Sequence, residues 1–180
     1  IIYIIDGGNG LIIAFDPKSK SFTKKQSIPK LDTWPNAVAL LSVIHIFHGA
    51  ANTKYDIVYN TIQDTVRTYE TEEKYDRIGG AAALLYYQNR IISLGGLNYG
   101  SSKSTDTVKV GTIKNDNMVE WEIKEQWKLP MSLYTFGCIS YRNYMFIFGG
   151  YNQPKKNAGY DSNGYQDAIY VLDLSDDSNA

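Results

Sequence analysis

The side chains in this sequence that are best suited to chemistry are two histidines and one cysteine. His45 and His48 lie three residues apart in an apolar run that predicts a β-strand, so they face opposite sides of that strand and cannot hold one metal ion together. Cys138 lies in another apolar run, where we expect a small buried apolar side chain. The sequence has no Ser-His-Asp grouping, no Cys-x-x-Cys spacing and no glycine-rich loop that opens a helix. It therefore predicts no catalytic residue, no metal site and no cofactor.

The composition of the chain indicates a globular protein and argues against several classes of partner and location. The 180-residue chain is long enough for one domain with its own core, and 43% of its residues are hydrophobic, which is typical of a globular protein. Its formal net charge of −1 argues against a nucleic-acid partner, because neutralising phosphates needs an excess of basic residues. A single cysteine excludes an internal disulfide, and no Asn-x-Ser/Thr sequon is present. No apolar run is long enough for a membrane helix, and the first residues do not resemble a signal peptide. We therefore expect a cytoplasmic protein without membrane insertion.

Apolar runs in this chain repeatedly end at glycine. Three of them end in a glycine pair, and a fourth ends with His48 in place of the first glycine of the pair. The last glycines of the four runs are separated by 41, 47 and 54 residues, and a period of that size indicates a repeat array. Glycine permits positive φ angles and close backbone approach, so we expect these glycines to shape loops and not to contact a ligand. They are Gly7, Gly8, Gly49, Gly95, Gly96, Gly149 and Gly150.

Each repeat is predicted to consist of β-strands alone. Two short apolar strands joined by a polar turn are expected in each of the segments 37–47, 81–94 and 136–148. A further strand is expected after the glycines at 11–17, 107–113 and 168–174, and an alternating strand at 21–25 and 118–124. The approximate repeats are 1–35, 36–78, 79–132 and 133–180, with three strands in the first and the last and four in the others. Four-stranded units that repeat at this interval predict an all-β fold of propeller blades.

These features together resemble the kelch repeat. The resemblance covers essentially the whole chain and rests on the double glycines, Phe15-Asp16-Pro17, Trp121 or Trp127, Leu129-Pro130 and Arg77-Ile78-Gly79-Gly80. It implies a kelch-type β-propeller with four-stranded antiparallel blades, of which about four repeats are present, so the ring is expected to be incomplete and the chain to be part of a longer one. It also implies a non-catalytic protein–protein interaction module that acts as a scaffold or as the substrate-recognition part of a larger protein.

Carbohydrate-binding or sugar-acting enzymes on kelch-like propellers are the alternative. A copper radical oxidase of this kind needs two histidine ligands, two tyrosine ligands and a Tyr–Cys crosslink, and the spacing of His45 and His48 argues against such a site. An isomerase or a lectin remains open, since aromatic side chains stack on sugars and the chain has 15 tyrosines, although most of them lie in predicted strands.

In the kelch family, partners bind to loops at one end of the propeller, and the longest such loop here is 149–167. It is rich in Tyr, Asn, Ser and Gly, a composition that favours protein contacts, while a surface insertion without a partner is the alternative. Arg77, at a matching family position, could anchor an acidic peptide or could pair with Asp76 or Glu73. The candidate residues for binding another protein are Tyr151, Asn152, Tyr160, Asn163, Tyr165, Asn98, Tyr99 and Arg77.

Overall fold

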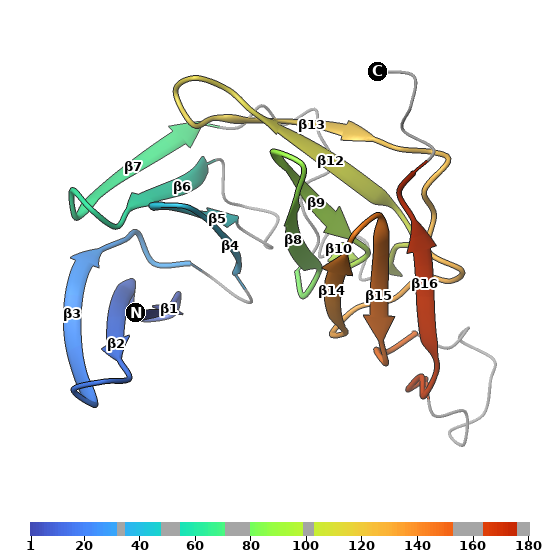
Figure 1. Ribbon diagram of the computed structural model, residues 1–180, viewed down its shortest axis with the longest axis horizontal. Coiled ribbons are helices and arrows are strands. Elements are labelled where there is room, and N and C mark those ends of the chain that lie inside the picture. Colours follow the sequence, from blue (N-terminus) through green and yellow to red (C-terminus); the bar gives the residue numbers. More distant parts are fainter. Residues whose placement is uncertain (32–34, 48–54, 71–79, 99–102, 153–163, 176–180) are drawn as a thin grey trace.

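Figure 1 shows the computed structural model of the chain, which describes residues 1–31, 35–47, 55–70, 80–98, 103–152 and 164–175. Every regular element in these ranges is a β-strand, and the strands form four antiparallel sheets of three or four strands each and one two-stranded ribbon. The prediction of an all-β fold is therefore confirmed. Because the described segments contain no helix, none of them provides a helix that could span a membrane.

The four sheets follow one another in chain order. Sheet 1 consists of β1 (Ile2–Asp6), β2 (Leu11–Asp16) and β3 (Ser21–Ser27). Sheet 2 consists of β4 (Asn36–Leu40), β5 (Val43–Phe47), β6 (Tyr55–Asn60) and β7 (Thr65–Glu70). Sheet 3 consists of β8 (Ala83–Tyr87), β9 (Arg90–Leu94), β12 (Val108–Ile113) and β13 (Val119–Ile123). Sheet 4 consists of β14 (Gly137–Tyr141), β15 (Tyr144–Phe148) and β16 (Ile169–Asp173), and a separate short ribbon pairs β10 (Leu97–Asn98) with β11 (Lys103–Ser104).

Tight turns set the register of these sheets. In sheet 3, Tyr87 pairs with Arg90 across a two-residue turn, in which Gln88 and Asn89 have φ angles of 46° and 62°. Positive φ at both central residues is typical of the turns that match the twist of a hairpin. Turns of the same length join β4 to β5 and β14 to β15. Since a slip of one residue would turn every side chain to the other face, these turns decide which apolar side chains share a face.

Apolar clusters between neighbouring sheets hold the fold together. Ile12 of sheet 1 packs in a cluster with Ile46 of sheet 2, and Phe47 of sheet 2 packs in another with Ile91 of sheet 3. The cluster with the most buried residues lies between sheets 3 and 4 and includes Ile92, Leu94, Val108, Val110, Trp127, Leu129, Leu133, Met145 and Ile147. Sheets 2 and 3 thus bury both of their faces, which explains the continuous apolar runs of β5 and β9. Figure 1 shows the sheets in this order, and β8 lies beside both β4 and β14.

The glycine pairs do not all adopt the same backbone. Gly95 and Gly96 have φ angles of 54° and 104°, and Gly149 and Gly150 have nearly the same values, 65° and 103°. In the first repeat, however, Asp6 pairs with Leu11, so Gly7 and Gly8 lie in a four-residue turn and the positive φ, 67°, falls on Gly10. The glycine pair of the first repeat therefore has a different backbone conformation from the pairs of the third and fourth repeats. Gly49 lies outside the described residues.

Candidate binding site: a tyrosine ladder

The connection between β15 and β16 folds back on itself directly after β15, from Gly149 onwards. Gly149 N donates to Ala168 O (3.3 Å), Gln166 N donates to Gly150 O (2.9 Å), and Asn152 N donates to Gly164 O (2.7 Å). A Cβ at Gly164 would lie 2.1 Å from the Asn152 carbonyl oxygen, so the two chain segments come this close only because residue 164 is glycine. The described ends of this loop therefore form a narrow antiparallel ribbon.

A third segment, from the connection between β13 and β14, completes this small sheet. Tyr134 N donates to Tyr151 O (3.1 Å) and Tyr151 N donates to Tyr134 O (2.9 Å), while Tyr151 also pairs with Tyr165. The ring centroids of Tyr134 and Tyr151 are 5.3 Å apart at an interplanar angle of 74°, and those of Tyr151 and Tyr165 are 5.0 Å apart at 71°. We call Tyr134, Tyr151 and Tyr165 the tyrosine ladder.

The tyrosine ladder is partly buried at one end and exposed to solvent at the other. Tyr134 and Tyr151 are partly buried, whereas Tyr165 is 74% exposed. Edge-to-face aromatic pairs of this kind contribute about 0.5–1.5 kcal/mol each beyond burial, so the three rings hold one another in place. Burial first, and then the neighbouring Tyr151 and Tyr165, raise the pKa of Tyr134. The Tyr134 hydroxyl therefore stays protonated at neutral pH and can donate a hydrogen bond.

Sheet 3 carries the same backbone arrangement with different side chains. Gly80 and Leu97 exchange two backbone hydrogen bonds (2.9 and 2.8 Å), as Tyr134 and Tyr151 do, and Leu97 pairs with Ser104, as Tyr151 does with Tyr165. The three positions of the tyrosine ladder thus correspond to glycine, leucine and serine in sheet 3. The aromatic surface is a property of the sheet 4 loop and not of the scaffold.

The residues predicted to bind a partner divide into three groups. Tyr151, Asn152 and Tyr165 lie together in the small sheet just described. Asn98 lies in β10 of the corresponding ribbon of sheet 3. The candidates that lie outside the described residues are Tyr160, Asn163, Tyr99 and Arg77.

Sequence analysis did not single out Tyr134. A signal was present, because Tyr134 precedes β14 by the same three residues by which Gly80 precedes β8. In both sheets this position pairs with the residue that follows the second glycine, which is Leu97 in one sheet and Tyr151 in the other.

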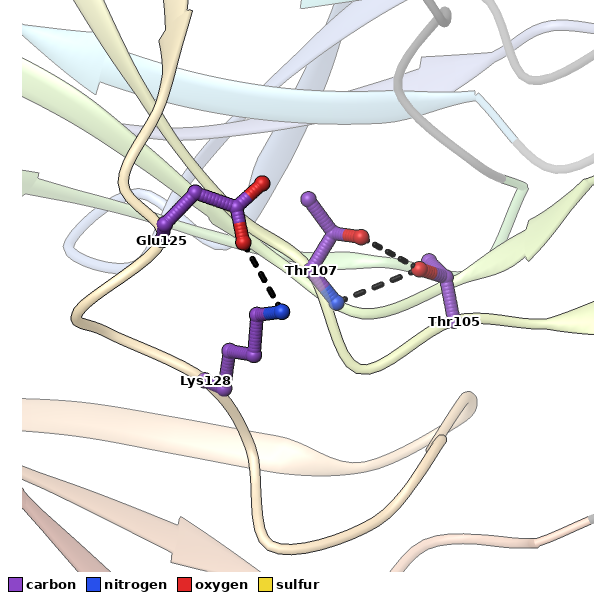
Figure 2. A network of polar contacts seen from close by, with 4 residues as sticks. All are labelled: Thr105, Thr107, Glu125 and Lys128. Atoms are coloured by element: carbon purple, nitrogen blue, oxygen red, sulfur yellow. Dashed lines mark hydrogen bonds and ion pairs between the residues drawn. The ribbon is translucent and has the colours of Figure 1, made fainter.

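Figure 2 shows polar contacts in two segments near this end of sheet 3, the residues just before β12 and the connection after β13. The Thr105 and Thr107 hydroxyls are 2.6 Å apart, Thr107 N donates to Thr105 Oγ1 (3.1 Å), and Lys128 Nζ lies 2.8 Å from Glu125 Oε2. The hydrogen bond and the charge of Glu125 raise the pKa of Lys128. Both side chains of this ion pair are exposed, so its contribution to stability is small. These contacts shape the loop and assemble no group of catalytic residues.

His45 lies in the core, and Cys138 is partly buried against the cluster between sheets 3 and 4. His45 is buried beside Phe47, its Nε2 has no hydrogen-bond partner in the described chain, and burial lowers its pKa. Burial raises the pKa of the Cys138 thiol to about 11. His48 lies outside the described residues, and the described part of the chain contains no group of three or more His, Cys, Asp or Glu side chains that could hold a metal ion.

Comparison with known proteins did not identify a family for this chain. No protein-family model matches the chain, and the comparison with curated proteins found no match. The resemblance to the kelch repeat therefore remains a prediction from the sequence motifs.

Proposed function

We propose that this chain is part of a cytoplasmic kelch-type β-propeller, an incomplete ring of about four repeats that binds another protein and has no chemistry of its own. It serves as a scaffold or as the substrate-recognition part of a larger protein. The four antiparallel sheets, joined in chain order through apolar clusters, support the propeller part of this proposal. The tyrosine ladder supports the binding part.

The tyrosine ladder carries the proposal because its chemistry is that of a protein-binding surface. Tyrosine supplies a large rigid contact area at little cost in conformational entropy, and its hydroxyl adapts to polar partners. Residues that dominate binding energy are enriched in tyrosine and surrounded by contacts that exclude water. The ring of Tyr165 is open to solvent and stands against the more buried ring of Tyr151. A partner that covers Tyr165 would exclude water from its ring and so produce a binding surface of this kind.

A photo-crosslinking experiment tests this proposal. The chain is expressed in cells with p-benzoylphenylalanine in place of Tyr165, and crosslinked proteins are identified by mass spectrometry. The matched control carries the same group in place of Phe22, an aromatic residue of sheet 1 that is 67% exposed. We expect a partner that crosslinks from position 165 and not from position 22. Capture of the same proteins from both positions, or of none from position 165, contradicts the proposal.

Affinity measurements with the identified partner give a second test. We expect Tyr165→Ala and Tyr151→Ala to weaken binding by about 30-fold each, the effect of losing about 2 kcal/mol at a central contact, with Phe22→Ala unchanged. Retention of partner affinity in both variants contradicts a role for the ladder. A glycan array separates the alternative function, since Tyr165-dependent binding of a sugar would favour the carbohydrate-binding class.

A further inference from the structure

The buried polar side chains of the described ranges are concentrated at the junction between sheets 2 and 3. They are Asn36, His45, Ser93 and Lys109, and none is more than 8% exposed. Asn36 and His45 share a face of sheet 2 with Phe47. Ser93 and Lys109 share a face of sheet 3 with Ile91. Phe47 and Ile91 pack in one cluster, so these two faces meet and enclose the polar groups.

His45 is the most buried of these four side chains, with 1% of its surface exposed. Its ring stacks on that of Phe47 with the centroids 6.2 Å apart, and its Nε2 atom has no hydrogen-bond partner in the described chain. Burial lowers the pKa of His45, because an imidazolium in this position is removed from water. The closed junction therefore favours a neutral His45.

The charged and titratable side chains on the two meeting faces do not offset a charge on His45. The strand register places Asp56, Arg67 and Tyr69 on the sheet 2 face, and Tyr86 and Lys109 on the sheet 3 face. The two cations would repel an imidazolium. Tyr69 donates a hydrogen bond to Asp116 O. Since the pKa of His45 is lowered and not raised, Asp56 does not compensate for a proton on the ring.

Sheets 1 and 2 have a core that does not involve this junction. A cluster that includes Ile12 and Ile46 joins the two sheets. The segment after β3 is bound there as well, because Ile28 N donates to Gly10 O (2.9 Å) and the Ile28 side chain is buried in the cluster. The half of the chain formed by sheets 1 and 2 can therefore keep its own core when its contact with sheet 3 is lost.

Sheets 3 and 4 form the other half and are joined in the same way. Their cluster includes Val108 and Met145. The connecting segment between β13 and β14, residues 124–136, is bound to sheet 3, because Gly96 N donates to Leu133 O (2.8 Å) and the Leu133 side chain is buried in the cluster. This half too has a core that does not involve sheet 2.

We propose that the junction between sheets 2 and 3 is a pH-sensitive joint. At neutral pH His45 is uncharged and the joint is closed. In mildly acidic solution His45 takes up a proton and the two halves separate, because water then hydrates the imidazolium. Each half keeps its own cluster. Both faces of the joint are covered within this chain, so the proposal needs no neighbour outside it, and it is independent of the tyrosine ladder at the end of sheet 4.

Fluorine NMR of the full chain labelled with 5-fluorotryptophan tests this proposal. Trp121 reports on the joint, because its ring packs edge-to-face on that of Phe47 with the centroids 5.3 Å apart. Trp127 is the internal control, since it is buried in the cluster between sheets 3 and 4. The solvent exposure of each ring is measured from its isotope shift between H₂O and D₂O as the pH falls from about 7.5 to about 5, the range in which histidine titrates.

We expect Trp121 to become exposed as the pH falls, while Trp127 stays buried and the far-UV circular dichroism stays unchanged. The ratio of open to closed chain should rise by up to about tenfold per pH unit below about pH 6.5, and level off below the pKa of His45 in the closed chain. Exposure of Trp121 and Trp127 together would show unfolding of the whole chain and overturn the proposal. A Trp121 ring that stays buried throughout the range overturns it too.

Histidine variants assign the response. His45→Leu should stay closed over the whole pH range, and His45→Gln is the second variant if the leucine variant does not fold, which the Trp127 signal at neutral pH reports. His48→Gln removes the other histidine of the sequence and is the matched control, which should open as the parent chain does. Opening of the His45 variants with the parent's pH profile, or loss of opening in His48→Gln, contradicts the assignment of the joint to His45.

Discussion

Replacing Gly95 by alanine should destabilise the chain more than the same replacement at Gly149. Both residues have positive φ, 54° and 65°, so both substitutions carry the cost of about 1–2 kcal/mol for a left-handed residue with a Cβ. Only at Gly95 does the new Cβ clash with a backbone atom, since the Leu133 carbonyl oxygen would lie 2.4 Å away. At Gly149 the closest atom would lie at 3.4 Å, an ordinary van der Waals distance.

The expected difference in stability between the two variants follows from the displacement of Leu133 that Gly95→Ala requires. Relieving the contact at Gly95 displaces Leu133, whose backbone makes hydrogen bonds to Gly96 and Thr105 at 2.8 and 3.2 Å. Losing each of these bonds costs about 1 kcal/mol. The Leu133 side chain is fully buried, and partial exposure costs about 1 kcal/mol more. We therefore expect a loss of about 3–5 kcal/mol in the free energy of unfolding for Gly95→Ala, and about 1–2 kcal/mol for Gly149→Ala.

Urea unfolding of the two variants beside the parent chain measures both values. The transition is followed by far-UV circular dichroism and by tryptophan fluorescence, and midpoints are compared only where the two probes and the slopes agree. Hydrogen exchange of the Leu133 amide reports directly on whether the connecting segment has been displaced. Equal destabilisation by the two substitutions, or unchanged protection of Leu133 in Gly95→Ala, would refute the link between the glycine and the bound segment.

Two further predictions concern buried titratable groups. Because burial lowers the pKa of His45, the unfolded chain takes up the proton first, so the free energy of unfolding should fall as pH drops below about 6.5 and level off below the folded pKa. Urea midpoints between pH 7.5 and 5 test this, and His45→Leu should flatten the dependence; an equal slope in the variant would contradict it. Because the pKa of Cys138 is about 11, its alkylation by iodoacetamide at pH 8 should be about 100-fold slower in the folded chain than in urea. Similar rates in the two states would contradict burial of the thiol.

Much of this fold could be predicted because its strands can be recognised from local sequence patterns. In segment 81–94, two apolar runs flank a polar turn, and the structure has β8 and β9 joined by Gln88 and Asn89. The alternation of apolar and polar residues and the residue types of a turn each depend on only a few neighbouring residues. Sequence alone is therefore sufficient to predict individual strands and hairpins. The sizes of the four sheets follow from the same patterns.

Contacts between loops that are far apart in the sequence could not be predicted in this way. Composition favoured Tyr151 and Tyr165, but their contact with Tyr134 depends on how two connections dock at the end of sheet 4. The glycine pairs show the same limit. Gly7-Gly8 and Gly95-Gly96 have the same letters, yet the first pair lies in a four-residue turn and the second opens a longer connection with positive φ at both residues. Loop length and packing, not residue type, decide the backbone there.

The tyrosine ladder and the exposed face of sheet 4 use the repeated scaffold in opposite ways. The ladder rests on backbone hydrogen bonds that sheet 3 also makes, so its side chains are free to differ: glycine, leucine and serine in one sheet, three tyrosines in the other. The exposed face keeps the apolar side chains that sheet 3 buries, because Ile169 and Val171 match Val108 and Val110. The repeats therefore diverge in side chain at the ladder and agree at the face. Under the proposed function, the ladder is the place where specificity for a partner would reside.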